Sequence, residues 1–185
     1  SAASDVYKRQ NMSFTEGSYE KVLIALFENL GYQHQYGPNI ERNYYVPFYE
    51  EQLIESLTTI NYGKPRPAID EAISKLKEIE IGSLPQRNEL FMDYLQHGIE
   101  VSFFDGKEQR NDIIYLIDYN DKNIKRNDFK VINQWTFVEN SEKRADIILF
   151  VNGLPLVVIE LKSPSREETN VSEAYLPVSY THLRA

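Results

Sequence analysis

The sequence predicts an α/β protein of the α+β kind, in which helices flank a mixed central β-sheet. Three observations support this fold class. Four helical patterns fill the first half of the chain, strand patterns follow them, and two apolar runs joined by a turn lie near the C-terminal end. The length of 185 residues suits one domain with a sizeable core.

The first expected helix covers residues 14–29 and ends before Gly31. Its buried face is expected to carry four apolar side chains at helical spacing: Tyr19, Leu23, Leu26 and Leu30. Three further helices are expected at residues 48–60, from Pro67 onward, and at residues 85–96. Their apolar stripes predict core packing, and no cofactor site is expected along them.

Strands are expected at residues 99–104, 112–118 and 129–138, followed by the apolar runs 147–151 and 154–161. In these two runs apolar residues do not alternate with polar ones, which indicates strands that are covered on both faces. Asn152 and Gly153 between the runs are typical of a hairpin turn.

Three charged residues, Asp146, Glu160 and Lys162, are embedded in this apolar hairpin. Buried charges are costly unless they are paired or bound to a metal. Carboxylates are natural ligands of Mg²⁺, which can lower the pKa of a bound water, and a lysine nearby can orient the nucleophile or neutralise developing charge. The pattern therefore predicts phosphodiester hydrolysis with Asp146 and Glu160 as metal ligands. The alternative is an ion pair of Lys162 with one of the acids.

The register of the hairpin decides whether the two acids can meet. A two-residue turn pairs Val151 with Leu154, and regular strands would then turn Asp146 and Glu160 to opposite faces. A loop of odd length would place both acids on one face. Because Pro155 has no N–H to donate, tight pairing beside the turn is disfavoured, and we expect an odd-length loop.

The stretch from Arg144 to Pro164, RADIILFVNGLPLVVIELKSP, resembles the PD-(D/E)xK nuclease superfamily. More narrowly, it resembles the N-terminal nuclease domain of the restriction (R, or HsdR) subunit of type I restriction-modification enzymes. Ala145 stands where the family usually has proline. Residues 19–32, 88–98 and 127–134 extend the resemblance over most of the chain.

This resemblance implies a restriction-endonuclease-like fold and Mg²⁺-dependent cleavage of double-stranded DNA, as in a type I site-specific deoxyribonuclease. It implies that Asp146, Glu160 and Lys162 are catalytic, with Mg²⁺ held by the two acids. Related nucleases also carry an acidic residue on the opening helix, and Glu20 is the best match for it. Glu16 is the alternative, although its spacing from Ser13 also fits a capping box.

The family usually has a Gln-x-x-x-Tyr motif on a helix after the lysine, but Tyr175 and Tyr180 have no glutamine four residues before them. Residues 12–176 are therefore expected to form an HsdR-type nuclease domain that is truncated at its C-terminal side. Residues 1–11 and 177–185 are expected to be non-native tails. Cleavage by this chain alone is not expected.

The resemblance implies modification (M) and specificity (S) subunits as partners that choose the DNA. It also implies a motor that uses ATP. The chain contains no Walker lysine motif, so ATP is expected to bind only in the motor domains, which are absent here.

The composition agrees with a module that other subunits deliver to DNA. The formal net charge is −8, whereas duplex affinity comes mainly from cations that neutralise phosphates. The chain has no cysteine, which excludes disulfides and favours a cytoplasmic location, and no apolar run approaches a membrane span. Two alternatives remain: a catalytically silent nuclease fold used for assembly or DNA positioning, and a repair-type nuclease of the same superfamily.

Overall fold

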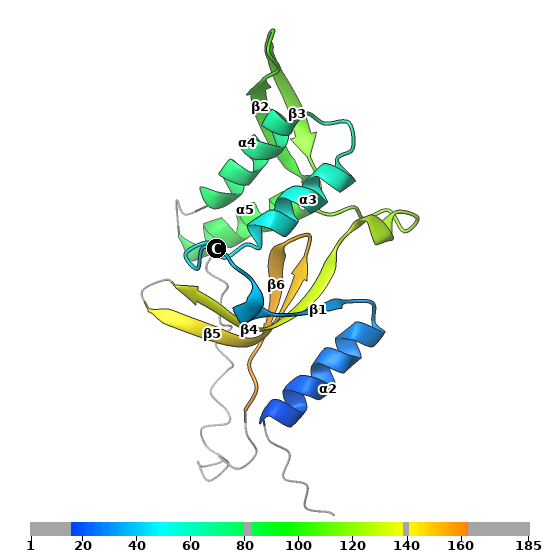
Figure 1. The fold of residues 1–185 in the computed structure, drawn as a ribbon. Helices are drawn as coiled ribbons and strands as arrows, with labels where there is room; N and C mark the ends of the chain where they lie inside the picture. Colours follow the sequence, from blue (N-terminus) through cyan, green and yellow to red (C-terminus); the bar gives the residue numbers. More distant parts are fainter. Residues whose placement is uncertain (1–15, 80–82, 139–140, 163–185) are drawn as a thin grey trace, which may run out of the picture.

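The computed structural model describes residues 16–79, 83–138 and 141–162 (Figure 1). The two expected tails, and the segment after Lys162 where the Gln-x-x-x-Tyr motif was sought, lie outside these ranges. In chain order the elements are α2 (Glu16–Asn29), β1 (Gln33–Tyr36), η1 (Gly37–Asn39), α3 (Glu50–Ile60), α4 (Arg66–Lys77), α5 (Leu84–His97), β2 (Ile99–Phe104), β3 (Gln109–Ile114), η2 (Ile124–Arg126), β4 (Phe129–Val138), β5 (Glu142–Val151) and β6 (Leu154–Ile159).

A mixed four-stranded sheet with the order β1-β4-β5-β6 forms the middle of the molecule. Strand β1 runs parallel to β4, while β4, β5 and β6 pair antiparallel. Helix α2 lies on one side of this sheet, and α3, α4 and α5 lie on the other with the β2–β3 hairpin (Figure 1). The expected α/β fold, a mixed sheet flanked by helices, is confirmed.

Two details of the sheet differ from the expectation. Strands β2 and β3 form a separate antiparallel sheet, and β3 begins and ends earlier than the expected range 112–118. The fourth strand of the central sheet is β1, which the sequence did not predict. Its sequence, Gln-His-Gln-Tyr, has no apolar pattern because the strand lies at a sheet edge and is held there by pairing with β4.

The largest core cluster is formed by α3, α4, α5, the β2–β3 hairpin and the start of β6. Its fully buried members include Leu53 and Leu57 of α3 and Ile69 of α4. The predicted core packing of these helices is therefore confirmed. Strand β2 alternates buried and exposed residues along its length, so only one of its faces contributes to the core.

Helix α2 buries only one of the four apolar residues expected on its inner face. Leu23 packs against the sheet with Ile24 and Phe27, whereas Tyr19, Leu26 and Leu30 are exposed. The helix carries apolar residues on more than one face, so its periodicity alone does not select the buried one. Its end is as expected, because Gly31 follows with a φ of 98°.

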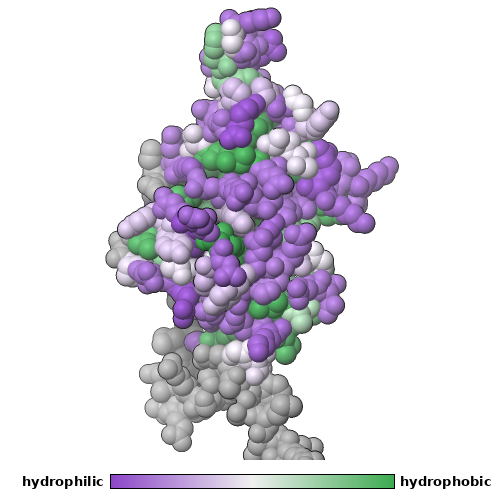
Figure 2. Space-filling view, in the orientation of Figure 1, coloured by the Kyte–Doolittle hydropathy of each residue, from purple (hydrophilic) through white to green (hydrophobic). Residues whose placement is uncertain are grey.

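The surface shown in Figure 2 is mainly hydrophilic, with small apolar patches. In the described part of the chain no helix is long and apolar enough to cross a membrane.

Candidate active site

The turn between β5 and β6 has two residues rather than the expected odd number. Val151 pairs with Leu154, which leaves only Asn152 and Gly153 in the loop. Their φ angles are 53° and 78°, a left-handed pair typical of tight hairpin turns, and asparagine and glycine adopt it at low cost. The prediction of an odd-length loop is therefore wrong.

A β-bulge in β6 nevertheless changes the register by one residue. Phe150 pairs with Pro155 but Leu149 pairs with Val157, so Leu156 is an extra residue in the ladder. Pro155 cannot donate a backbone hydrogen bond, and an irregularity beside it is therefore favoured. The extra residue shifts every later residue of β6 to the opposite face of the sheet. An odd-length loop would have had the same effect.

Asp146 and Glu160 consequently lie opposite each other, one position beyond the pair Ile147–Ile159. The pKa of the Glu160 carboxyl is raised, first by burial and second by the negative charge of Asp146, which requires the two carboxylates to be close. The Oδ2 atom of Asp146 accepts a hydrogen bond of 2.7 Å from the backbone N–H of Leu161. This bond holds the end of the β6 segment against β5 and orients Asp146.

The two acids fit a hard divalent cation. Burial, and second the negative charge of Asp146, raise the pKa of Glu160, and a cation between the two carboxylates would offset both effects. Mg²⁺ is commonly bound by one or two carboxylates and completes its shell with water and substrate phosphate. Within residues 16–79, 83–138 and 141–162 no group of three or more His, Asp or Glu residues is placed to hold a metal. The fit therefore rests on Asp146 and Glu160.

Lys162 is exposed and stands at the end of the described segment 141–162. It comes two residues after Glu160 and directly after Leu161, whose N–H contacts Asp146. Its position in the chain agrees with a role beside the two acids, and that role stays a prediction.

Glu20 reaches from α2 to strand β4. Its Oε1 atom accepts a hydrogen bond from Nδ2 of Asn133, and its Oε2 atom accepts one of 2.9 Å from Nε2 of Gln134. Asn133 pairs with Ile147 and Trp135 pairs with Ala145, so Gln134 stands opposite Asp146 in the ladder. The structure therefore anchors Glu20 through the neighbour of Asp146. The side chain of Glu16, the alternative to Glu20, lies outside the described residues.

Asn133 and Gln134 were not identified as site residues from the sequence. Two adjacent amides in the middle of a mainly apolar strand are unusual, and that interruption is the signal that could have drawn attention to them. The Nε2 atom of His34 lies 2.9 Å from Oδ1 of Asn133. His34 thus bonds to Asn133, and Asn133 and Gln134 both bond to Glu20.

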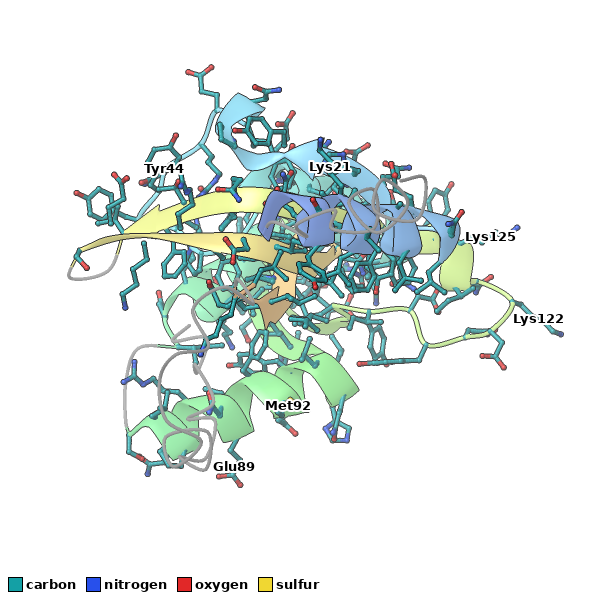
Figure 3. The ribbon with its side chains drawn as sticks, turned by 90° about the horizontal axis from the view of Figure 1, so that it is seen from below. Lys21, Tyr44, Glu89, Met92, Lys122 and Lys125 are labelled. Carbon is teal, nitrogen blue, oxygen red and sulfur yellow. The ribbon has the colours of Figure 1, made fainter. Side chains whose placement is uncertain are left out.

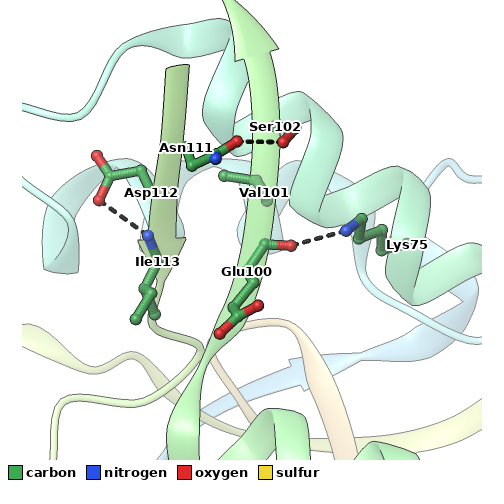
Figure 4. Close-up of a pocket in the computed structure, with 7 residues that line it drawn as sticks. All are labelled: Lys75, Glu100, Val101, Ser102, Asn111, Asp112 and Ile113. Atoms are coloured by element: carbon green, nitrogen blue, oxygen red, sulfur yellow. Dashed lines mark hydrogen bonds between the residues drawn. The ribbon is translucent and has the colours of Figure 1, made fainter. Parts of the chain in front are cut away.

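A shallow pocket lies elsewhere, between α4 and the β2–β3 hairpin (Figure 4). Lys75 Nζ donates to the carbonyl of Glu100 at 2.7 Å, and Ser102 bonds to Asn111. Asp112, which also lines the pocket, forms an ion pair with Lys64. Because these polar groups already satisfy one another, the pocket offers no arrangement comparable to the paired acids of the β5–β6 hairpin.

Comparison with known proteins agrees with the geometry. Residues 13–178 match the family described as "Type I restriction enzyme R protein N terminus". The chain is 30% identical over 176 residues to the type I restriction enzyme HindI endonuclease subunit of Haemophilus influenzae, a match that covers 86% of this chain and 16% of that protein. It is 29% identical over 171 residues to the type I restriction enzyme EcoprrI endonuclease subunit of Escherichia coli, which covers 90% of this chain and 50% of that protein.

A more distant relative is the putative type I restriction enzyme MjaIXP endonuclease subunit of Methanocaldococcus jannaschii, which is 26% identical over 160 residues. That match covers 81% of this chain and 15% of the relative, so the chain spans between 15% and 50% of the length of these three relatives. The family match, by contrast, extends over nearly the whole chain and includes the paired acids of the hairpin. The chain therefore belongs to the family of type I restriction enzyme R protein N-terminal domains.

Proposed function

We propose that this chain is the Mg²⁺-dependent endonuclease module of a type I restriction-modification R subunit, and that it cleaves double-stranded DNA by phosphodiester hydrolysis. The observation that carries the proposal is the meeting of Asp146 and Glu160 at the end of the β5–β6 hairpin remote from its turn. The names of the relatives, which are endonuclease subunits, support the same activity.

Each residue has a distinct role in this proposal. Asp146 and Glu160 would hold Mg²⁺, and the ion would supply a lowered pKa for the attacking water and stabilisation of negative charge on the phosphate. The N–H of Leu161 keeps the Asp146 carboxylate in position. Lys162 orients the attacking water or neutralises developing negative charge, and Glu20 contributes a further acid from α2.

Other parts of the enzyme would bring the DNA to this site. The chain covers 16% of the HindI relative, and its net charge of −8 is unfavourable for duplex binding by the isolated module. We therefore infer that modification and specificity subunits select the DNA and that ATP is used by motor domains outside this chain. The absence of cysteine favours a cytoplasmic location for this machinery.

A plasmid-cleavage assay tests the proposal. The R subunit that carries this domain is assembled with its modification and specificity subunits and supplied with Mg²⁺ and ATP. We expect Asp146→Asn and Lys162→Ala each to lower cleavage by about 10²-fold or more, because each removes a group that acts on the transition state. Lys122→Ala is the matched control, since Lys122 points away from the molecule on an exposed loop (Figure 3).

ATP hydrolysis by the same assemblies separates loss of chemistry from loss of assembly, and we expect it to be unchanged in every variant. Wild-type cleavage by Lys162→Ala would refute the role given to that lysine. Wild-type cleavage by Asp146→Asn would refute the nuclease assignment and favour a nuclease fold retained for assembly or DNA positioning.

A further inference from the structure

The regular alternation of side chains between the two faces of the sheet is interrupted at one residue of β4. Ile132 and Trp135 belong to the same buried cluster, although residues three apart lie on opposite faces of a regular strand. Between them, Asn133 and Gln134 both reach Glu20 on the α2 side, although adjacent side chains of a regular strand point in opposite directions. The irregular residue is Gln134, whose φ of 57° lies in the left-handed region that residues with a Cβ rarely adopt.

The alternation of side chains is interrupted at the same level in the neighbouring strand β5. Ala145 belongs to the cluster of Trp135, whereas Ile147 belongs to the cluster against α2, although residues two apart share a face in a regular strand. The residue between them is Asp146, which stands opposite Gln134. The strained backbone thus coincides with a candidate metal ligand, and unfavourable backbone conformations persist mainly where function requires them.

We propose that Asn133 and Gln134 are positioning residues that hold the Glu20 carboxylate at the level of Asp146, where it would accept from water bound to a cation held by Asp146 and Glu160. The inference rests on the proposed function and extends it to two amides outside the hairpin. Each amide donates to a different oxygen of Glu20, which fixes the plane of the carboxylate. Each oxygen keeps further lone-pair capacity for a cation or its bound water.

His34 determines which way the Asn133 amide points. Its Nε2 atom donates to Oδ1 of Asn133 at 2.9 Å, and the Nδ2 group must then face Glu20. The left-handed backbone at Gln134 orients the second amide. Only this irregularity lets two successive side chains reach the same carboxylate. The chain from His34 to Glu20 is therefore directional, with donors at each step toward the acid.

Mn²⁺ binding, measured by isothermal titration calorimetry on the 185-residue chain, tests the inference through a double-mutant cycle. We expect Gln134→Ala to weaken Mn²⁺ binding about tenfold, as loss of a group outside the directly coordinating residues of a metal site commonly does. Because Gln134 acts through Glu20, the double variant Gln134→Ala/Glu20→Ala should bind Mn²⁺ no more weakly than Glu20→Ala alone. Gln109→Ala, which alters an exposed glutamine of β3, is the matched control and should bind as the unaltered chain does.

Circular dichroism shows whether each variant is folded. Gln134→Gly is a second variant that removes the amide and suits the positive φ, so weakened Mn²⁺ binding with an intact fold is expected there too. Unchanged Mn²⁺ affinity in both Gln134 variants would overturn the inference, and so would additive losses from Gln134→Ala and Glu20→Ala. If Asp146→Asn abolishes Mn²⁺ binding in the same experiment, the proposed metal site still stands. Failure of the unaltered chain to bind Mn²⁺ would overturn both the inference and the proposed metal site.

Discussion

The two ends of the β5–β6 hairpin are built in opposite ways. At the closed end, the turn of Asn152 and Gly153, the side chain of Asn152 is fully buried and its hydrogen-bonding groups are satisfied by Leu116, Asn127 and Asp128. At the open end, where Asp146 faces Glu160, two like charges are held together beside a strained backbone. Stability is concentrated at one end of the hairpin, and this permits an unfavourable arrangement at the other.

The two ends of the hairpin also differ in how their buried charges are compensated. Lys130 is buried close to the closed end, and its Nζ atom lies 2.6 Å from both carboxylate oxygens of Asp128 and from Oε1 of Gln52. Its charge is therefore compensated within the fold. At the open end, burial, and second the charge of Asp146, raise the pKa of Glu160, and Asp146 accepts a hydrogen bond from the N–H of Leu161. Charge is thus compensated by an opposite charge at the closed end, whereas two acids of like charge meet at the open end.

Asn152→Asp should have the largest effect on stability. The new carboxylate would face the carbonyl of Leu116 and Oδ1 of Asn127, where Asn152 now donates two hydrogen bonds of 2.8 Å. An uncompensated buried charge costs about 4 kcal/mol, which urea unfolding would measure as a lower free energy of unfolding. Asn120→Asp is the control, because its oxygen would still accept from Lys122 in an exposed loop. A loss below about 1 kcal/mol would contradict the structural role of the closed end.

Gly153→Ala should have the next largest effect. Gly153 has a φ of 78°, and an added Cβ would lie 2.5 Å from the backbone N of Leu53 and 2.6 Å from the carbonyl O of Tyr49. Backbone strain and overpacking together predict a loss of about 3 kcal/mol in urea unfolding. Gly106→Ala separates the two causes, since Gly106 has a φ of 95° but open space around it. Equal losses in the two variants would show that the contact with α3 contributes nothing.

Glu160→Gln should have the smallest effect and the opposite sign. The pKa of Glu160 is raised in the folded chain, so its charged form is unfavourable there and stability falls as pH rises from the ordinary glutamate pKa through the raised one. With a chelator present, the variant should be slightly more stable than the unaltered chain at pH 7, and the advantage should shrink on acidification. Glu28→Gln, an exposed change on α2, controls for loss of a surface charge. A variant less stable than wild type at pH 7 would contradict strain at the open end.

Much of the fold was predictable because its signals are local. The strand ranges 99–104 and 129–138 agree with β2 and β4, and the helices α3, α4 and α5 lie close to the expected ranges. Strand β1 was missed because its short polar sequence contains no periodic signal and depends on pairing with β4. The buried face of α2 was also wrong, since only contact with the sheet distinguishes Ile24 from Leu26.

The sequence by itself singled out the candidate site, because Asp146, Glu160 and Lys162 stand in an apolar hairpin where buried charge is costly unless it is paired. It also determined the turn residues, since Asn152 and Gly153 favour left-handed conformations. Only the tertiary structure decided how the two acids meet: a bulge at Leu156, rather than the length of the turn, sets the register. Likewise, only the packing of α2 on the sheet brings Glu20 to Asn133 and Gln134. Local preferences specify turns and helices, whereas register and approach between elements depend on contacts between residues far apart in the chain.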